Sequence, residues 1–218
     1  MMKPVADPSW PEKIWRASST PDMIRRAIYI IGALPAGWVF YRGLTDQLGA
    51  DPVRTLEKTL GIWGLRFLVA GLAITPLRRL GGPNLVRYRR AIGLLAFFYA
   101  SLHLYAYVWF DEGLDFAAIL KDIIKRPYVT VGFAAFLILL PLAVTSNTTM
   151  IKRLGGPAWQ KLHKAVYLAC TLAAVHFIML VKSWPPEPLI YAGLVAVLLA
   201  VRLVVYVQKR NERARRTA

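Results

Sequence analysis

The apolar residues of this chain gather into six long blocks separated by short polar stretches. The blocks cover roughly residues 24–41, 60–77, 91–110, 128–145, 162–181 and 189–207. A helix rises about 1.5 Å per residue, so about 20 residues cross a hydrocarbon core of about 30 Å, and each block approaches that length. Short connections and the lack of a separate polar domain predict one all-α membrane bundle of six transmembrane helices.

The flanks of this bundle are polar. We expect residues 1–23 to form a cytoplasmic N-terminal segment, residues 24–207 the transmembrane domain, and residues 208–218 a basic cytoplasmic tail. A hydrophobic content of 56% and a mean hydropathy of +0.43 agree with a membrane protein embedded in lipid.

The polar stretches differ in charge, and this difference predicts the orientation of the chain. The stretches after the second and fourth blocks and the C-terminal tail are strongly basic, whereas basic and acidic residues balance in the others. Because Lys and Arg in short loops stay in the cytoplasm, both termini are predicted to be cytoplasmic. The net charge of +16 is spread between apolar blocks rather than gathered in one patch, so nucleic acid is not an expected partner.

A short repeat marks the two blocks that carry the chemistry. Arg-Leu-Gly-Gly-Pro occurs at residues 79–83 and again at 153–157, and His103 and His176 lie 20 and 19 residues after the respective prolines. Two parallel helices entering from one side would bring these imidazoles to one depth, as axial ligands of a haem iron. The alternative for each histidine is a hydrogen bond to a neighbouring helix. Two axial imidazoles would leave no open iron position, which favours one-electron transfer.

Two further side chains are candidates for cofactor binding. His163 lies near the cytoplasmic end of the fifth block, and aligning the repeats places Arg89 opposite it. His163 could ligate a second haem with a partner other than histidine, contact a flavin or quinone, or lie at the interface, so the haem count stays at one or two. Arg66 lies in the outer third near the depth of the histidine pair, where it could bind haem propionates or reach to the interface. Arg202 is expected to reach to the inner interface.

The sequence contains no recognisable nucleotide-binding motif. Electrons would therefore come from another protein, a bound flavin or a quinone. These features favour an electron-transfer subunit of an oxidoreductase system over a catalytic subunit.

Several motifs together resemble the MsrQ family, the haem-binding membrane subunit of the bacterial periplasmic protein-methionine-sulfoxide reductase system. The resemblance covers about residues 24–207, and its motifs lie at 50–53 (ADPV), 72–77 (LAITPL), 100–103 (ASLH), 126–128 (RPY), 159–163 (WQKLH), 166–168 (VYL) and 188–193 (PLIYAG). His103 and His176 match the family's haem-ligand pair, and His163 matches its third histidine. Arg89 stands where the wider ferric-reductase and NADPH-oxidase superfamily has a fourth histidine.

The resemblance implies a ferric-reductase-like transmembrane fold in the bacterial inner membrane, with haem b and FMN as cofactors. It also implies electron transfer from the quinone pool or a cytoplasmic flavin reductase to a periplasmic molybdopterin-dependent enzyme, which reduces oxidised methionines in proteins. One alternative is a stand-alone transmembrane ferric reductase. A different class, a small transporter or channel, would use intramembrane His and Arg to line a pathway, but the spans hold few acidic residues.

Overall fold

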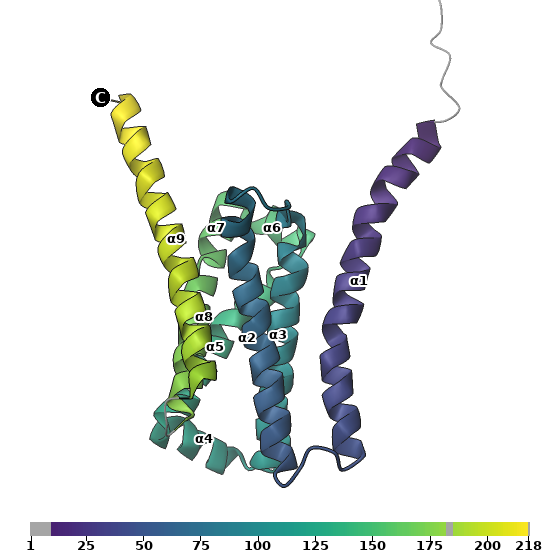
Figure 1. The fold of residues 1–218 in the computed structure, drawn as a ribbon, viewed down its shortest axis with the longest axis vertical. Coiled ribbons are helices and arrows are strands. Elements are labelled where there is room, and N and C mark those ends of the chain that lie inside the picture. Colours follow the sequence, from purple (N-terminus) through teal and green to yellow (C-terminus); the bar gives the residue numbers. More distant parts are fainter. Residues whose placement is uncertain (1–9, 182–184, 218) are drawn as a thin grey trace, which may run out of the picture.

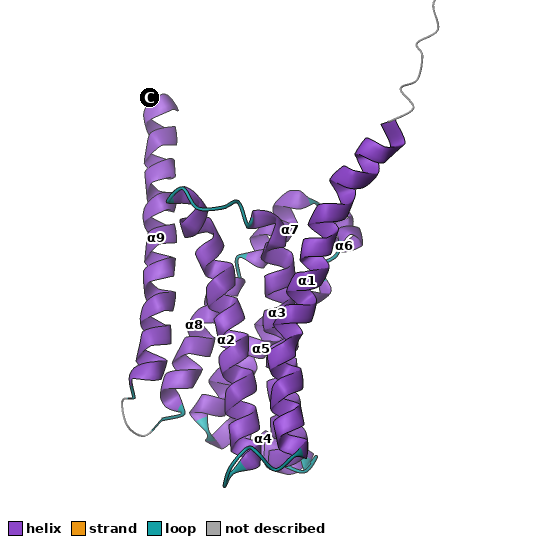
Figure 2. Cartoon of the chain, turned by 45° about the vertical axis from the view of Figure 1, so that its right-hand side comes forward, coloured by secondary structure: helices purple, strands orange, loops and turns teal. Residues whose placement is uncertain are grey.

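The computed structural model describes residues 10–181 and 185–217, which form helices joined by turns and contain no strand (Figures 1 and 2). The elements are α1 (Trp10–Leu44), α2 (Pro52–Arg79), η1 (Val86–Tyr88), α3 (Arg89–Ala106), η2 (Tyr107–Asp111), α4 (Phe116–Lys125), α5 (Pro127–Val144), α6 (Thr148–Leu154), α7 (Gly156–His163), α8 (Val166–Met179) and α9 (Pro186–Thr217).

Six segments of the described chain are long and apolar enough to cross a membrane, which confirms the predicted all-α fold of six transmembrane helices. They are Asp22–Leu44, Pro52–Arg79, Val86–Asp111, Pro127–Val144, Gly156–Met179 and Pro186–Glu212. The fifth segment consists of α7 and α8, which are separated at Lys164 and Ala165. The expected division at residues 23 and 208 stays a prediction, because α1 and α9 run through both positions and residues 1–9 lie outside the described chain.

The bundle has two distinct ends. At one, which we call the terminal end, lie the beginning of α1, the end of α9, and the short helices α6 and α7 (Figure 1). At the other, the α4 end, α4 lies across the helix axes (Figure 1). The described parts of the predicted cytoplasmic regions all belong to the terminal end.

Both copies of the Arg-Leu-Gly-Gly-Pro repeat turn the chain at the terminal end. The first glycine of each copy adopts a left-handed backbone, with φ of +85° at Gly81 and +75° at Gly155. Glycine carries no Cβ that would make this conformation costly, so it suits the turn that follows each helix. The two ends differ in detail, because α2 ends at Arg79 with Leu80 as its C-cap, whereas α6 continues to Leu154 and Gly155 is its C-cap. The copies then diverge, because α7 starts at once whereas α3 follows a short coil and η1.

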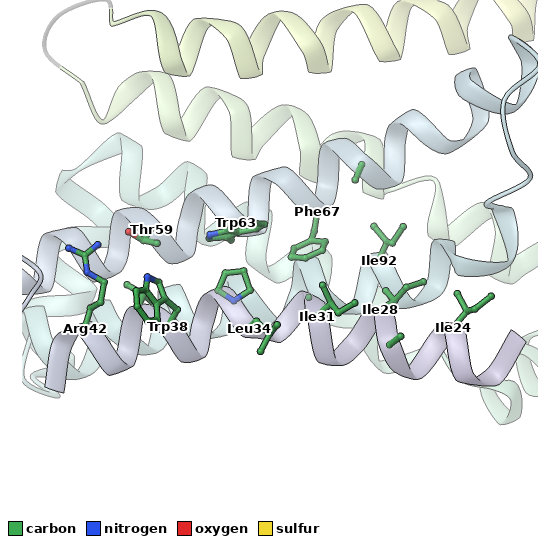
Figure 3. Close-up of a pocket in the computed structure, with 15 residues that line it drawn as sticks. Ile24, Ile28, Ile31, Leu34, Trp38, Arg42, Thr59, Trp63, Phe67 and Ile92 are labelled. Carbon is green, nitrogen blue, oxygen red and sulfur yellow. The ribbon is translucent and has the colours of Figure 1, made fainter. Parts of the chain in front are cut away.

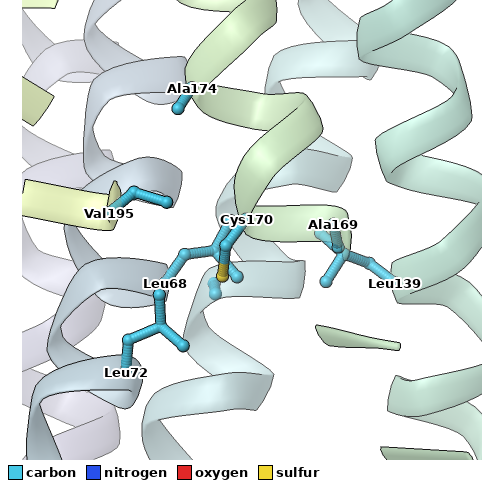
Figure 4. Close-up of a cluster of buried hydrophobic side chains, with 8 residues drawn as sticks. Leu68, Leu72, Leu139, Ala169, Cys170, Ala174 and Val195 are labelled. Atoms are coloured by element: carbon cyan, nitrogen blue, oxygen red, sulfur yellow. The ribbon is translucent and has the colours of Figure 1, made fainter. Parts of the chain in front are cut away.

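The helices pack most extensively as two pairs, α2 with α3 and α5 with α8. A buried apolar cluster joins these pairs to α9 (Figure 4). Its buried members are Leu68, Leu72, Ala96, Leu139, Ala169, Cys170, Ala174 and Val195. The thiol of Cys170 is therefore fully enclosed by the core.

Side chains from other helices form hydrogen bonds to the backbone near two prolines. Pro76 has no N–H to donate to the Leu72 carbonyl one turn earlier, and Arg202 Nη2 donates to that oxygen at 2.7 Å. Arg202 Nη1 donates to the Tyr167 hydroxyl at 2.8 Å. Arg202 therefore ties α9 to α2 and α8, and the expectation that it reaches to the interface was wrong.

The second of these contacts lies beside Pro35 in α1. The hydroxyl of Tyr99, from α3, donates to the Gly32 carbonyl at 2.7 Å and accepts from the Ala36 N–H at 3.0 Å. These two backbone groups would bond to each other in a regular helix, so Tyr99 is inserted between them. This fully buried side chain fastens the middle of α1 to α3.

Candidate functional site

The structure brings His103 and His176 together in the half of the bundle nearer the α4 end. His103 lies near the end of α3 and His176 near the end of α8. Their ring centroids are 6.2 Å apart, and the ring planes cross at 70°. The depth match inferred from the repeat thus corresponds to close contact between the two rings.

Each imidazole is oriented by the backbone of the helix that pairs with its own. His103 Nδ1 lies 2.9 Å from the Glu57 carbonyl of α2, and His176 Nδ1 lies 2.7 Å from the Tyr128 carbonyl of α5. A carbonyl oxygen only accepts, so Nδ1 carries the hydrogen in both rings. The lone pair of Nε2 is then available to a metal, with the ring held by the hydrogen bond on its far side.

A glycine makes room for each of these rings. A Cβ at Gly61 would lie 3.3 Å from His103 Nδ1, and a Cβ at Gly132 would lie 2.7 Å from His176 Nδ1. Each glycine follows the residue of its accepting carbonyl by four positions, that is, by one helical turn. The two helix pairs therefore repeat one arrangement: a histidine on one helix lies against a glycine on the other.

The pair suits the axial positions of a flat metal macrocycle. The described residues hold no group of three or more His, Cys, Asp or Glu side chains that could bind a metal ion. The remaining ligands would have to arrive with the metal, as in a porphyrin. Metal–nitrogen bonds of about 2 Å, with each ring centre roughly 1 Å beyond its nitrogen, require centroids about 6 Å apart. The observed 6.2 Å agrees with this separation.

Arg66 lies on α2, five positions after Gly61, the glycine beside His103. Its Nε donates to the Tyr191 hydroxyl of α9 at 2.8 Å, and its guanidinium lies 4.8 Å from the Trp63 ring centroid. The side chain is exposed and forms no ion pair within the described part of the chain. A cation at this depth in a membrane favours an anionic partner, so propionate binding stays a prediction.

His163 lies apart from the pair, at the terminal end of the bundle. Its Nδ1 lies 3.0 Å from the Trp159 carbonyl, and its Nε2 lies 3.3 Å from Ser146 Oγ at the end of α5. Its ring stacks on Trp159 with centroids 3.8 Å apart. The structure does not bring His163 to the other two histidines, and a cofactor role there stays a prediction.

The glycines and carbonyls behind the histidines were missed by the sequence analysis. A glycine inside a helix lowers helix stability by about 1 kcal/mol relative to alanine. Its presence in an apolar helix therefore indicates a place where another group packs closely against the backbone. Gly61 and Gly132 carry that signal, but other glycines in the spans do too. Only the observed pairing of the helices distinguishes Gly61 and Gly132, which lie against histidines, from the other glycines.

Comparison with known proteins agrees with this architecture. Residues 60–174 match the family described as "Ferric reductase like transmembrane component". The chain is 53% identical over 177 residues to a Brucella anthropi protein, a match covering 81% of this chain and 80% of that one. It is 54% identical over 176 residues to proteins of Brucella ovis and Brucella canis, with the same coverage. All three relatives are named "Protein-methionine-sulfoxide reductase heme-binding subunit MsrQ". The chain therefore belongs to the MsrQ family of ferric-reductase-like transmembrane proteins.

Proposed function

We propose that this chain is a membrane b-type cytochrome, the haem-binding subunit of a protein-methionine-sulfoxide reductase system. The observation that carries the proposal is the pair of imidazoles at 6.2 Å, each hydrogen-bonded through Nδ1 to a neighbouring helix. The names of the relatives, which are heme-binding subunits, support the same function.

In this proposal His103 and His176 hold the haem iron through Nε2. The Glu57 and Tyr128 carbonyls keep both rings in the tautomer that can ligate. When bound, haem b supplies one-electron transfer between ferric and ferrous states. With both imidazoles holding the group, one-electron transfer would be favoured over the binding of water or oxygen. Arg66, held by Tyr191, is placed to pair with a propionate.

The proposed orientation in the bacterial inner membrane puts both termini in the cytoplasm. The α4 end and the histidine pair then lie toward the periplasm, on the side of the proposed acceptor, a molybdopterin-dependent methionine-sulfoxide reductase. The donor would be the quinone pool or a cytoplasmic flavin reductase, with FMN as a further cofactor. His163, at the cytoplasmic end, would serve a second haem or the entry of electrons.

The experiment that tests the haem site compares alanine variants of the three histidines. Detergent-purified His103→Ala and His176→Ala are each expected to lose the low-spin b-type bands of the pair in dithionite-reduced minus oxidised spectra. His163→Ala is the matched control and should keep them, because its ring lies at the other end of the bundle. Low-spin bands at wild-type intensity in both His103→Ala and His176→Ala would contradict the ligand assignment.

A second measurement separates the proposed system from a stand-alone ferric reductase. The reduced protein is mixed with ferric chelates or with the periplasmic enzyme, and haem reoxidation is followed. Reoxidation by the enzyme supports the proposal, whereas reoxidation by chelates alone would contradict it.

A further inference from the structure

The short helix α4 carries an apolar stripe that no other described part of the chain covers. Phe116, Leu120 and Ile124 are 75%, 59% and 73% exposed. Successive members are four positions apart, so they differ by about 40° around the helix and form one continuous stripe. The helix connects the third and fourth membrane-spanning segments and lies across the helix axes (Figure 1). The stripe is therefore close to the boundary between lipid and water.

Short connections hold both ends of α4 at this boundary. The third spanning segment ends at Asp111, and four residues, 112–115, lead from it to α4. Only Arg126 separates the end of α4 from Pro127, where the fourth segment begins. An extended chain spans at most about 3.5 Å per residue, so neither connection lets α4 move far from the ends of the two spans.

Contacts on the bundle side fix the rotation of α4 about its own axis. Asp122 is buried, and its Oδ2 accepts from the Tyr107 hydroxyl of η2 at 3.3 Å. The same oxygen lies 2.7 Å from Arg126 Nη1. Leu120 precedes Asp122 by two positions, or about 200° of turn, so it lies nearly opposite on the helix. With Asp122 held against the bundle, the apolar stripe faces away from it.

The exposed surface of α4 also has a charged part. Lys121 and Lys125 are exposed, and each lies about 100° around the helix from the stripe residue before it. The surface is thus divided lengthwise into an apolar stripe and a lysine row. A helix in a membrane interface has this division, with its apolar side among acyl chains and its lysines reaching to phosphates. A docking site for a soluble protein typically has an apolar centre with a polar rim around it instead.

Exposed aromatic pairs mark the membrane surface at this end of the bundle. On α1, Trp38 and Tyr41 stack with centroids 5.7 Å apart, and Figure 3 shows Trp38 close to Arg42. At the end of the third span, Tyr105 and Trp109 stack with centroids 5.6 Å apart. All four of these stacked rings are exposed, and exposed Trp and Tyr gather at the level of the lipid headgroups. Because α4 begins seven residues after Trp109, it lies near this level.

We propose that α4 lies flat in the lipid–water interface and that phospholipid is the partner of its exposed surface. The side chains of Phe116, Leu120 and Ile124 extend among the acyl chains. Lys121 and Lys125 lie beside the phosphate groups. This lipid contact does not depend on the haem function proposed above.

The test is the accessibility of spin labels on α4 in proteoliposomes of phosphatidylethanolamine and phosphatidylglycerol. Cys170 is the one cysteine of the sequence and is buried, so a cysteine introduced on the surface of α4 is labelled selectively. In Leu120→Cys and Ile124→Cys, we expect the nitroxide to collide several-fold more often with oxygen, which concentrates in lipid, than with a water-soluble nickel chelate. Phe116→Cys reports on the same stripe if either variant does not fold.

Lys121→Cys and Lys125→Cys are the matched controls, each one position after a test residue. Their nitroxides should prefer the nickel chelate. A nickel preference at the stripe positions as well would overturn the lipid contact, because the stripe would then lie in water, open to a soluble protein. An oxygen preference at all positions, lysines included, would also overturn it, because α4 would then lie within the hydrocarbon core rather than at its surface.

Discussion

Two histidines that are 73 positions apart in the sequence meet because each lies against a glycine of its partner helix. The hydrogen bonds to Glu57 and Tyr128 use backbone carbonyls, so the side chains at 57 and 128 are free to differ. A mutation of those side chains would leave the accepting oxygen in place. The residues that cannot change without moving the imidazoles are the glycines.

The two glycines differ in how closely they approach their histidines, and this difference leads to a testable prediction. A Cβ at Gly132 would lie 2.7 Å from His176 Nδ1, closer than such contacts occur, whereas the equivalent distance at Gly61 is 3.3 Å. Gly132→Ala is therefore expected to displace His176 and to weaken or shift the low-spin haem spectrum more than Gly61→Ala does. Redox titration and electron paramagnetic resonance of the purified proteins measure the effect.

Gly93→Ala is the control for this pair, because a Cβ there meets nothing within 4 Å. It should leave both the spectrum and the midpoint potential unchanged. Equal spectra for Gly132→Ala and Gly93→Ala would show that His176 is not held against α5 as described.

The residues around the two histidines differ in how far the sequence alone predicts them. His103 and His176 could be predicted because the repeat fixes their depth along parallel helices. Gly61, Gly132 and the accepting carbonyls depend on which helices pair and how each is rotated, and no local pattern contains that information. Arg202 was misread for the same reason: its acceptor exists because Pro76, on another helix, leaves a carbonyl free.

The hydropathy of the sequence predicted all six membrane-spanning helices, but it did not predict where one of them is broken. The break between α7 and α8 falls at Lys164 and Ala165, inside what the sequence analysis took as one helix. The short helix α4 has exposed Phe116, Leu120 and Ile124 at a spacing of four, while Asp122 on its other side is buried and pairs with Arg126 at 2.7 Å. With ten residues, α4 is too short to cross the hydrocarbon core, so it gives no span signal.

Tyr99 bonds the middle of α1 to α3, beside the buried apolar contacts of Ala36 and Val39, and a change at Tyr99 tests its contribution. Tyr99→Phe removes both hydrogen bonds and leaves the Gly32 carbonyl and Ala36 N–H to each other or to nothing. The loss is expected to destabilise the packing of α1 by about 1–3 kcal/mol. Hydrogen exchange of residues 30–38 in detergent, faster in the variant, would measure it.

Tyr41→Phe is a matched control on α1, since its side chain is exposed. It should exchange like the wild-type protein. Unchanged protection in Tyr99→Phe would mean that the apolar contacts of α1 suffice to hold it.

For the whole molecule, the charge pattern predicts one orientation. The terminal end carries the unopposed basic stretches, so a green fluorescent protein fused after Ala218 should fold in the cytoplasm and fluoresce. Alkaline phosphatase inserted after Asp115, at the α4 end, should be active in the periplasm. If green fluorescent protein fluoresced after Asp115 and alkaline phosphatase were active after Ala218, the orientation would be the reverse, and the proposed direction of electron flow would be wrong.

The bundle contains two hairpin-like pairs, α2 with α3 and α5 with α8, and each pair already satisfies its own histidine with its own carbonyl and glycine. Synthesis in the membrane therefore completes α2 and α3 as a folded half before α5 emerges from the ribosome. Under the proposed function, this half offers only one axial ligand, and a second becomes available when residue 176 has been inserted. Haem would then bind stably only late in biogenesis, after the chain has been inserted as far as residue 176. Truncated products would release the cofactor rather than retain a reactive iron with an open position.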